Sequence, residues 1–322
     1  MENLFWWGAV FVLIILYTLQ SLFTKLYTEK YPGKPENAAS VLTVASGITV
    51  VIITFFCFSL CSFTFNPYSI LIGALNAVAL YGYNYFIVKA SSSGPYSILM
   101  MFNLSGGIII PIIAALIMGW DSSWDTTFQI ILNTVSILAI ISAVYMVSVK
   151  KEASADGKST ESGKKSGISA SFILSCLGLA VCNGVYGIFL TLQNQTEAAG
   201  GEANRDEMVI TTFFFAALIS FVLGLIREKG AFLGAFRQNK ISAMYLIATS
   251  LVFALAINLI VIIIPHFDTT ILYTIDNSSV LIMSVLISWI FFKEKLSRLN
   301  VIGISIMVLA LVCMNLLPAI VL

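Results

Sequence analysis

Long apolar runs separated by short polar breaks dominate the pattern of this chain. A helix needs roughly 20 residues to cross the hydrocarbon core of a bilayer, and ten runs of about that length can be traced. The predicted spans are 5–26, 38–61, 68–89, 96–118, 128–149, 168–192, 208–226, 241–264, 269–292 and 299–320. The pattern therefore predicts an all-α polytopic membrane protein with ten transmembrane helices.

The composition agrees with a membrane protein and excludes an ordinary soluble domain. Hydrophobic residues make up 59% of the chain and charged residues 10%, and the mean hydropathy is +0.96. The first ten residues hold Glu2 and no Lys or Arg before a full apolar run, so we expect no cleaved signal peptide. The five cysteines all fall in predicted spans, where we expect them to pack rather than form disulfides or a metal site.

The basic residues predict the orientation. Sixteen of the 17 Lys and Arg residues lie in or beside the odd-numbered loops, and only Arg205 lies on the other side. The positive-inside rule places the odd-numbered loops in the cytoplasm and both termini outside. We expect an integral protein of a bacterial plasma membrane, with the lipid bilayer as its surroundings.

Span 1 carries a polar stripe at helical spacing. Its residues Tyr17, Gln20, Ser21, Thr24 and Lys25 share one helix face. Such a stripe must face protein or water, so it either forms hydrogen bonds between helices or lines a cavity. Because Lys25 lies near the end of the span, we expect its amine to snorkel toward the interface.

Span 3 groups several polar aromatic side chains around Asn84. Tyr81, Tyr83 and Tyr85 flank this asparagine. Tyrosines near the end of a span usually form the interfacial belt, but the same group could line a cavity. The sequence leaves both interpretations open.

Span 4 places Asn103 beside Gly106 and Gly107, with Pro111 one turn later. The asparagine and glycines could form either a close-packing site or a ligand contact. Span 6 has a comparable face, which carries Asn183 and Tyr186.

Span 9 contains a carboxylate in an apolar run, Asp276, next to Asn277. An ionised carboxylate in the bilayer costs at least ~2.5 kcal/mol unless a partner, water or a ligand compensates. Asp276 could bind a proton or a substrate cation, or it could be a structural carboxylic acid hydrogen-bonded between helices. Tyr273 and Asn277 align on one face of the same span.

One hydrophilic segment divides the chain. We predict a first five-helix repeat over 1–149, a flexible cytoplasmic linker over 150–167 and a second five-helix repeat over 168–322. The linker contains Gly157-Lys158-Ser159-Thr160, which resembles the tail of a phosphate-binding loop. Glu152 stands where that motif needs glycine and no strand precedes it, so we expect no nucleotide site.

The division into five and five spans predicts an inverted repeat, because an odd number of spans reverses the second copy. Asn84 and Asn103 are 19 residues apart, as are Asn258 and Asn277, and the pairs are displaced by 174 positions. At this displacement Asp276 aligns with Phe102. The carboxylate is thus a feature of the second copy alone.

The segment Phe291-Phe292-Lys293-Glu294-Lys295-Leu296-Ser297, followed by Gly303, resembles the Glu-x-Leu-Ser turn and last span of EamA-type members of the drug/metabolite transporter superfamily. The ten-span plan is similar to theirs along the whole chain. This resemblance implies alternating access, a central cavity lined by spans 1, 3, 4, 6, 8 and 9, and transport of small metabolites without ATP.

We therefore expect a secondary active transporter of a small organic metabolite, such as an amino acid, nucleobase or vitamin-like solute. Coupling would be to protons or to exchange with a counter-substrate, and the resemblance favours export. The candidate substrate-binding residues are Tyr17, Gln20, Asn84, Asn103, Asn183, Tyr186, Asn258, Tyr273 and Asn277, with Asp276 as the coupling residue.

The alternative is a channel or receptor without coupled transport. An enzyme is not expected, because Asp276 is the single carboxylate inside a span and the lone His266 lies in a loop. We expect no cofactor, no metal and no nucleic-acid partner.

Overall fold

The computed structural model of the chain describes residues 2–56, 63–118, 127–148, 169–227, 231–263, 266–267, 269–294 and 298–321. These residues form helices and contain no β-strand. The α-helices are α1 (Glu2–Lys30), α2 (Pro35–Thr54), α3 (Pro67–Ser91), α4 (Tyr96–Met118), α5 (Thr127–Ser148), α6 (Ala170–Gln195), α7 (Arg205–Arg227), α8 (Lys240–Ile263), α9 (Thr269–Ile290) and α10 (Arg298–Val321). Short 3₁₀ helices η3 (Glu197–Ala199), η4 (Gly201–Asn204) and η5 (Ala231–Phe236) lie in the connections. The expected linker 150–167 lies outside the described residues.

Eight of these helices, α1 to α8, are long and apolar enough to cross a membrane. Two shorter apolar segments, Ile275–Ile290 and Val301–Cys313, belong to α9 and α10. The prediction of an all-helical polytopic membrane protein is confirmed at this level.

Local sequence signals explain where several helices begin. Proline occupies the first turn of α2 and of α3, where a missing N–H costs nothing. Asn66 caps α3, since its side-chain oxygen accepts hydrogen bonds from the Tyr68 and Ser69 amides at 2.9 and 3.2 Å. Ser169 caps α6 in the same way through the Phe172 amide.

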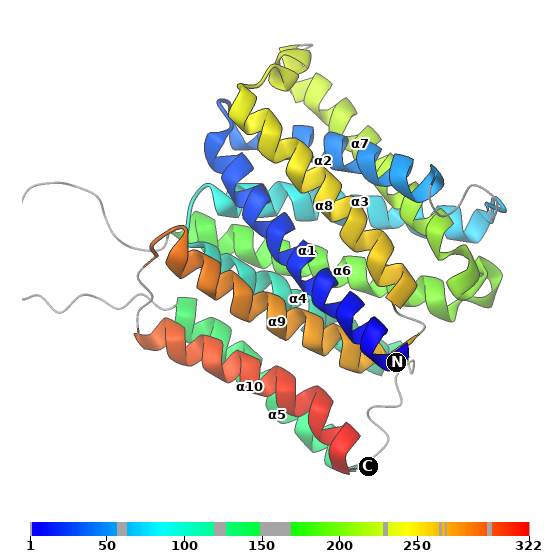
Figure 1. Cartoon of the computed structure of the whole chain (residues 1–322), viewed down its shortest axis with the longest axis vertical. Helices are drawn as coiled ribbons and strands as arrows, with labels where there is room; N and C mark the ends of the chain where they lie inside the picture. The colour runs from blue at the N-terminus through cyan, green and yellow to red at the C-terminus, as the bar shows by residue number, and fades with distance from the viewer. Residues whose placement is uncertain are drawn as a thin grey trace, which may run out of the picture.

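The connections gather alternately at two ends of the bundle. At one end, Tyr31 donates to the Ala235 carbonyl and Asn239 donates to the Lys30 carbonyl, so the α1–α2 and α7–α8 connections meet. We call this the odd-loop end. At the opposite, even-loop end, Asn66 of the α2–α3 connection donates to the Ala198 carbonyl of the α6–α7 connection. Helix α1 begins and α10 ends at the even-loop side in Figure 1.

Helices from the two predicted halves are intermixed in the bundle. α4 packs on α6 and α9, and α1 packs on α8 and α9. α2 and α3 pack on α7, while α5 and α10 lie together at one edge (Figure 1). Apolar side chains such as Val78, Ile247 and Trp289 are exposed on the outer surface, as expected of helices that face lipid.

Candidate functional site

Asn103 of α4 joins three helices in the interior of the bundle. Its side-chain nitrogen donates to the Tyr83 hydroxyl of α3 at 3.4 Å. Its backbone carbonyl accepts from the side-chain nitrogen of Asn183 on α6 at 2.7 Å. The side-chain oxygen of Asn103 is buried and has no hydrogen-bond partner among the described residues. This atom is an open acceptor in a site where such groups are normally paired.

The two glycines after Asn103 are needed for close packing of α4 on α6. A Cβ atom at Gly106 would lie 2.2 Å from the Ala180 carbonyl oxygen. A Cβ atom at Gly107 would lie 2.7 Å from the side-chain nitrogen of Asn183, so this glycine makes room for the contact with Asn103. Of the two interpretations offered by the sequence, the glycines thus serve close packing, and the packing positions the polar group beside them.

The tyrosines of α3 separate into two groups. Residues two positions apart on a helix point to nearly opposite sides. Tyr83 therefore faces inward to Asn103, whereas Tyr81 bonds to Arg227 and Tyr85 to Lys89 at the odd-loop end. Tyr83 thus faces the protein interior, whereas the positions of Tyr81 and Tyr85 agree with the interfacial interpretation.

Helices α4 and α9 bring Asn103 and Asn277 to a similar depth. α4 begins and α9 ends at the odd-loop end, so the two packed helices are antiparallel. The Tyr96 hydroxyl of α4 lies near the Ser284 hydroxyl of α9. Asn103 lies seven residues further into α4, and Asn277 lies seven residues back along α9, which is about 10 Å in each helix.

Asp276 lies next to Asn277 and is buried, with 6% of its surface exposed. Its Oδ1 atom has no hydrogen-bond partner within the protein. Its counterpart in the first half, Phe102, is also buried. A buried carboxyl group with an open oxygen can hold a proton or accept a hydrogen bond from a cationic ligand.

The polar face of α1 lies beside the start of α4, toward the odd-loop end from Asn103. Gln20 is buried and Tyr17 is half-buried. The Ser21 hydroxyl lies near that of Tyr96 and donates to the Tyr17 carbonyl at 2.9 Å. This stripe therefore faces protein, as its spacing predicts.

The expectation that Lys25 snorkels to the interface is wrong. Its side chain is only 6% exposed, and its amine donates to the carbonyls of Ser91 at 2.6 Å and Gly94 at 3.2 Å. The amine also pairs with Glu29 at 3.5 Å. The reason is that the α3–α4 connection offers carbonyl groups beside α1, and these replace water around the charge.

Glu294 holds the other side of the same connection. Its carboxylate accepts from the Tyr96 amide at 2.7 Å and from the Ser97 amide and hydroxyl at 3.4 and 3.2 Å, and it also accepts from the Ser288 hydroxyl. A carboxylate at the start of a helix is favourable because the first amides are unpaired. Together, Lys25 and Glu294 tie α1, α4 and α9 at the odd-loop end.

Several candidate residues do not join the Asn103 region. Asn258 donates to the Thr54 hydroxyl at 3.1 Å and to the Ala254 carbonyl at 2.8 Å, so it links α8 to α2. By contrast, Tyr186 packs against an apolar cluster that Tyr83 also contacts. The side chain of Tyr273 lies outside the described part of the structure.

Other buried polar atoms also have no partner within the protein. They include side-chain atoms of Asn76, Asn84, Ser250 and Ser278. Among the described residues, no group of three or more His, Cys, Asp or Glu could hold a metal ion. Tyr83 was not singled out as a binding residue from the sequence, and its offset of two positions from Tyr81 and Tyr85 is the signal that could have found it.

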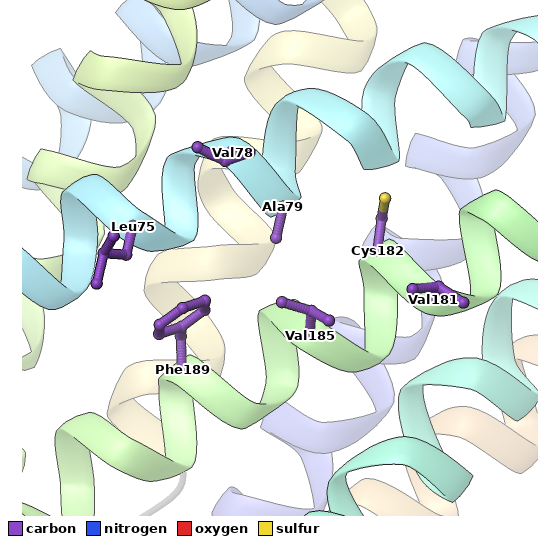
Figure 2. Close-up of a pocket in the computed structure, with 7 residues that line it drawn as sticks. All are labelled: Leu75, Val78, Ala79, Val181, Cys182, Val185 and Phe189. Atoms are coloured by element: carbon purple, nitrogen blue, oxygen red, sulfur yellow. The ribbon is translucent and has the colours of Figure 1, made fainter.

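A groove of about 290 Å³ lies between α3 and α6 (Figure 2). Its lining is apolar and consists of Leu75, Val78, Ala79, Val181, Cys182, Val185 and Phe189. Three of these side chains are about half exposed, so the groove opens on the outer surface rather than into the Asn103 region. It is a site distinct from the polar one.

Comparisons with known proteins identify the fold without naming a family. No family model and no curated protein matches the chain. A solved crystal structure, of a protein without further description, is similar over 96% of this chain and 98% of its own length. The TM-score is 0.53 and the sequence identity is 13%, so this likeness concerns the fold alone.

Proposed function

We propose that this chain is a secondary active transporter of a small organic metabolite that works by alternating access. The observation that carries the proposal is that the main helix contacts fall into the pairs that a twofold relation between the two halves would require, and that buried polar side chains lie where α4 meets α9.

The helix contacts support ten membrane crossings arranged as a 5+5 inverted repeat. A twofold relation would exchange α1 with α6, α2 with α7, and so on to α5 with α10. Four pairs of helix contacts are related by this exchange: α1·α8 with α3·α6, α3·α7 with α2·α8, α4·α6 with α1·α9, and α4·α5 with α9·α10. Three more, α2·α7, α4·α9 and α5·α10, map onto themselves. Inverted halves of this kind can exchange conformations and open a shared site to either side.

The substrate site lies where α4 meets α9, close to the axis of this relation. Asn103 and Asn277 are equivalent under the displacement of 174 positions and lie at a similar depth. Asn183 and Tyr83 position Asn103, while its open side-chain oxygen is available to a ligand donor. A solute with both donors and acceptors, such as an amino acid, nucleobase or vitamin-like molecule, suits these amide and hydroxyl groups.

Asp276 supplies the asymmetry that coupling needs. The carboxyl group can hold a proton in one state and release it, or pair with a cationic substrate, in the other. Coupling by protons or by exchange both fit this role, and export is favoured by the resemblance to EamA-type transporters.

The substrate class is tested by screening. We expect a metabolite from a library to raise the Tm of the purified protein and to be taken up by proteoliposomes that contain it. Asn103→Ala should weaken both responses to that metabolite. If the ligand stabilises Asn103→Ala as strongly as the wild type, the site is misplaced.

The coupling role is tested with Asp276→Asn, which keeps the shape of the side chain and removes its ionisable proton. We expect wild-type uptake to vary with pH and the variant to lose this dependence, in proteoliposomes at a series of pH values. Glu36→Gln, at the start of α2, is the matched control and should behave as the wild type. An unchanged pH profile in Asp276→Asn would exclude coupling through this residue.

A further inference from the structure

The apolar groove and Lys89 lie along the same face of α3, and Arg227 of α7 lies beside Tyr85 of this face. Val78 and Leu75, in the groove, are 61% and 50% exposed on the outer surface. Tyr81, Tyr85 and Lys89 follow at four-residue spacing toward the odd-loop end. The groove and the basic residues therefore form one continuous strip.

Lys89 and Arg227 both lie over the Tyr85 ring. The Lys89 amine is 5.4 Å from the ring centroid and 3.5 Å from the Tyr85 hydroxyl. The Arg227 guanidinium is 5.8 Å from the same centroid and donates to the Tyr81 hydroxyl at 2.9 Å. Within the described residues, neither cation pairs with a carboxylate. Two positive charges therefore lie together at the end of the strip.

We propose that this strip binds one anionic phospholipid of the leaflet at the odd-loop end. The phosphate lies between Lys89 and Arg227, hydrogen-bonded to the amine and the guanidinium. One acyl chain runs along α3, and its terminal carbons enter the groove against α6.

The length of the strip fits such a lipid. Lys89 and Ala79 are ten residues apart on α3, which corresponds to about 15 Å. Half of the ~30 Å hydrocarbon core is the same length. A chain whose headgroup is held at Lys89 thus reaches the groove with its terminal carbons.

The chemistry of both ends agrees with this ligand. The groove is lined by carbon atoms and the thiol of Cys182, and Figure 2 shows Ala79 and Val185 directed into the space between α3 and α6. The guanidinium and ammonium groups recognise phosphate by charge and hydrogen bonds. Basic residues at the cytoplasmic side of membrane helices bind anionic headgroups, and tyrosines stabilise that depth.

Lipid titration followed by native mass spectrometry tests the headgroup. Phosphatidylglycerol and phosphatidylcholine with identical acyl chains are added to the delipidated protein in detergent, with inorganic phosphate in a parallel series. We expect selective binding of phosphatidylglycerol and no stabilisation by phosphate alone. The double variant Lys89→Gln/Arg227→Gln should bind phosphatidylglycerol roughly 30-fold more weakly. Lys240→Gln, at the same end on α8, is the control and should bind as the wild type.

A second variant tests the groove independently of charge. Val185→Trp fills the groove, whereas Ile247→Trp adds the same ring to an exposed position of α8. We expect Val185→Trp to weaken the binding of long-chain phosphatidylglycerol several-fold and to leave the binding of a short-chain form unchanged. Ile247→Trp should change the binding of neither lipid. All variants are first checked for an unchanged elution volume and Tm.

Three results would overturn the proposal. They are equal binding of the two headgroups by the wild type, equal binding of phosphatidylglycerol by the wild type and the double variant, and equal binding of the long-chain lipid by the two tryptophan variants. None of these measurements depends on transport, so they judge the lipid site separately from the transport function.

Discussion

Asn103 and Asn258 show how two buried asparagines can have different roles. Both are about 5% exposed. Asn258 uses its nitrogen for bonds to Thr54 and Ala254, which link α8 to α2. The side-chain nitrogen of Asn103 makes one long bond to Tyr83, and no described residue donates to its side-chain oxygen. Asn258 is therefore a structural residue, whereas the side-chain oxygen of Asn103 is available to a ligand.

The two alanine variants should separate these roles. Truncating Asn103 removes a ligand contact, which we expect to raise KM about tenfold or more, since an unmade hydrogen bond in a buried site costs about 1–3 kcal/mol. Asn258→Ala should instead lower Tm and leave KM unchanged. The measurements are transport kinetics and thermal unfolding of both variants. The reverse pattern, with Asn258→Ala affecting KM alone, would contradict the assignment.

At the scale of residues, helical spacing predicted part of the polar site. Asn103 and Asn183 were chosen from the sequence, and the structure joins them. Lys25 was misjudged because its partners are carbonyl groups of a distant connection, which no local pattern reveals. Spacing gives the face of a helix, but it does not say which neighbour that face meets.

The crossing of α4 over α6 is the tightest feature at the scale of elements. We expect Gly106→Ala to lower the free energy of unfolding by about 1–3 kcal/mol or prevent folding, since the added methyl meets the backbone of Ala180. Gly8→Ala is the matched control, because a Cβ there has nothing within 4 Å. Thermal unfolding in detergent measures both. A Tm of Gly106→Ala equal to that of the control would show that this crossing is loose.

The connection between α3 and α4 is held by Lys25 and Glu294, and the second of these can be tested alone. Glu294→Gln loses charge-assisted hydrogen bonds to the first amides of α4, each of about 1.5–3 kcal/mol. We expect Tm to fall by several degrees. Glu29→Gln, whose carboxylate is 41% exposed, should change Tm little. Equal Tm values for the two variants would mean that Glu294 does not stabilise this end.

The bounds of most helices followed from the apolar runs. Helix α1 is an exception, because it continues to Lys30 rather than ending at 26. Its last turn contains Tyr27 and Thr28, which are polar in the pattern but buried against other elements. A hydropathy pattern marks the part of a helix within the hydrocarbon, and tertiary packing extends it further.

At the scale of the whole molecule, the sequence predicted an all-helical membrane protein because the length and position of apolar runs can be read from the local sequence. The arrangement of helices depends on contacts between segments far apart, and these came from the structure. The 5+5 plan and transport remain proposals, supported by the exchange of helix contacts and by the polar groups where α4 meets α9.

Countertransport is the most direct test of a carrier with a single site open alternately to each side. Proteoliposomes are loaded with an excess of the unlabelled metabolite found by screening, and a trace of labelled metabolite is added outside. The proposed mechanism predicts transient accumulation of label above the equilibrium level, and a smaller overshoot in Asn103→Ala. Simple equilibration of label without an overshoot, in wild-type protein that binds the metabolite, would contradict alternating access and indicate a channel.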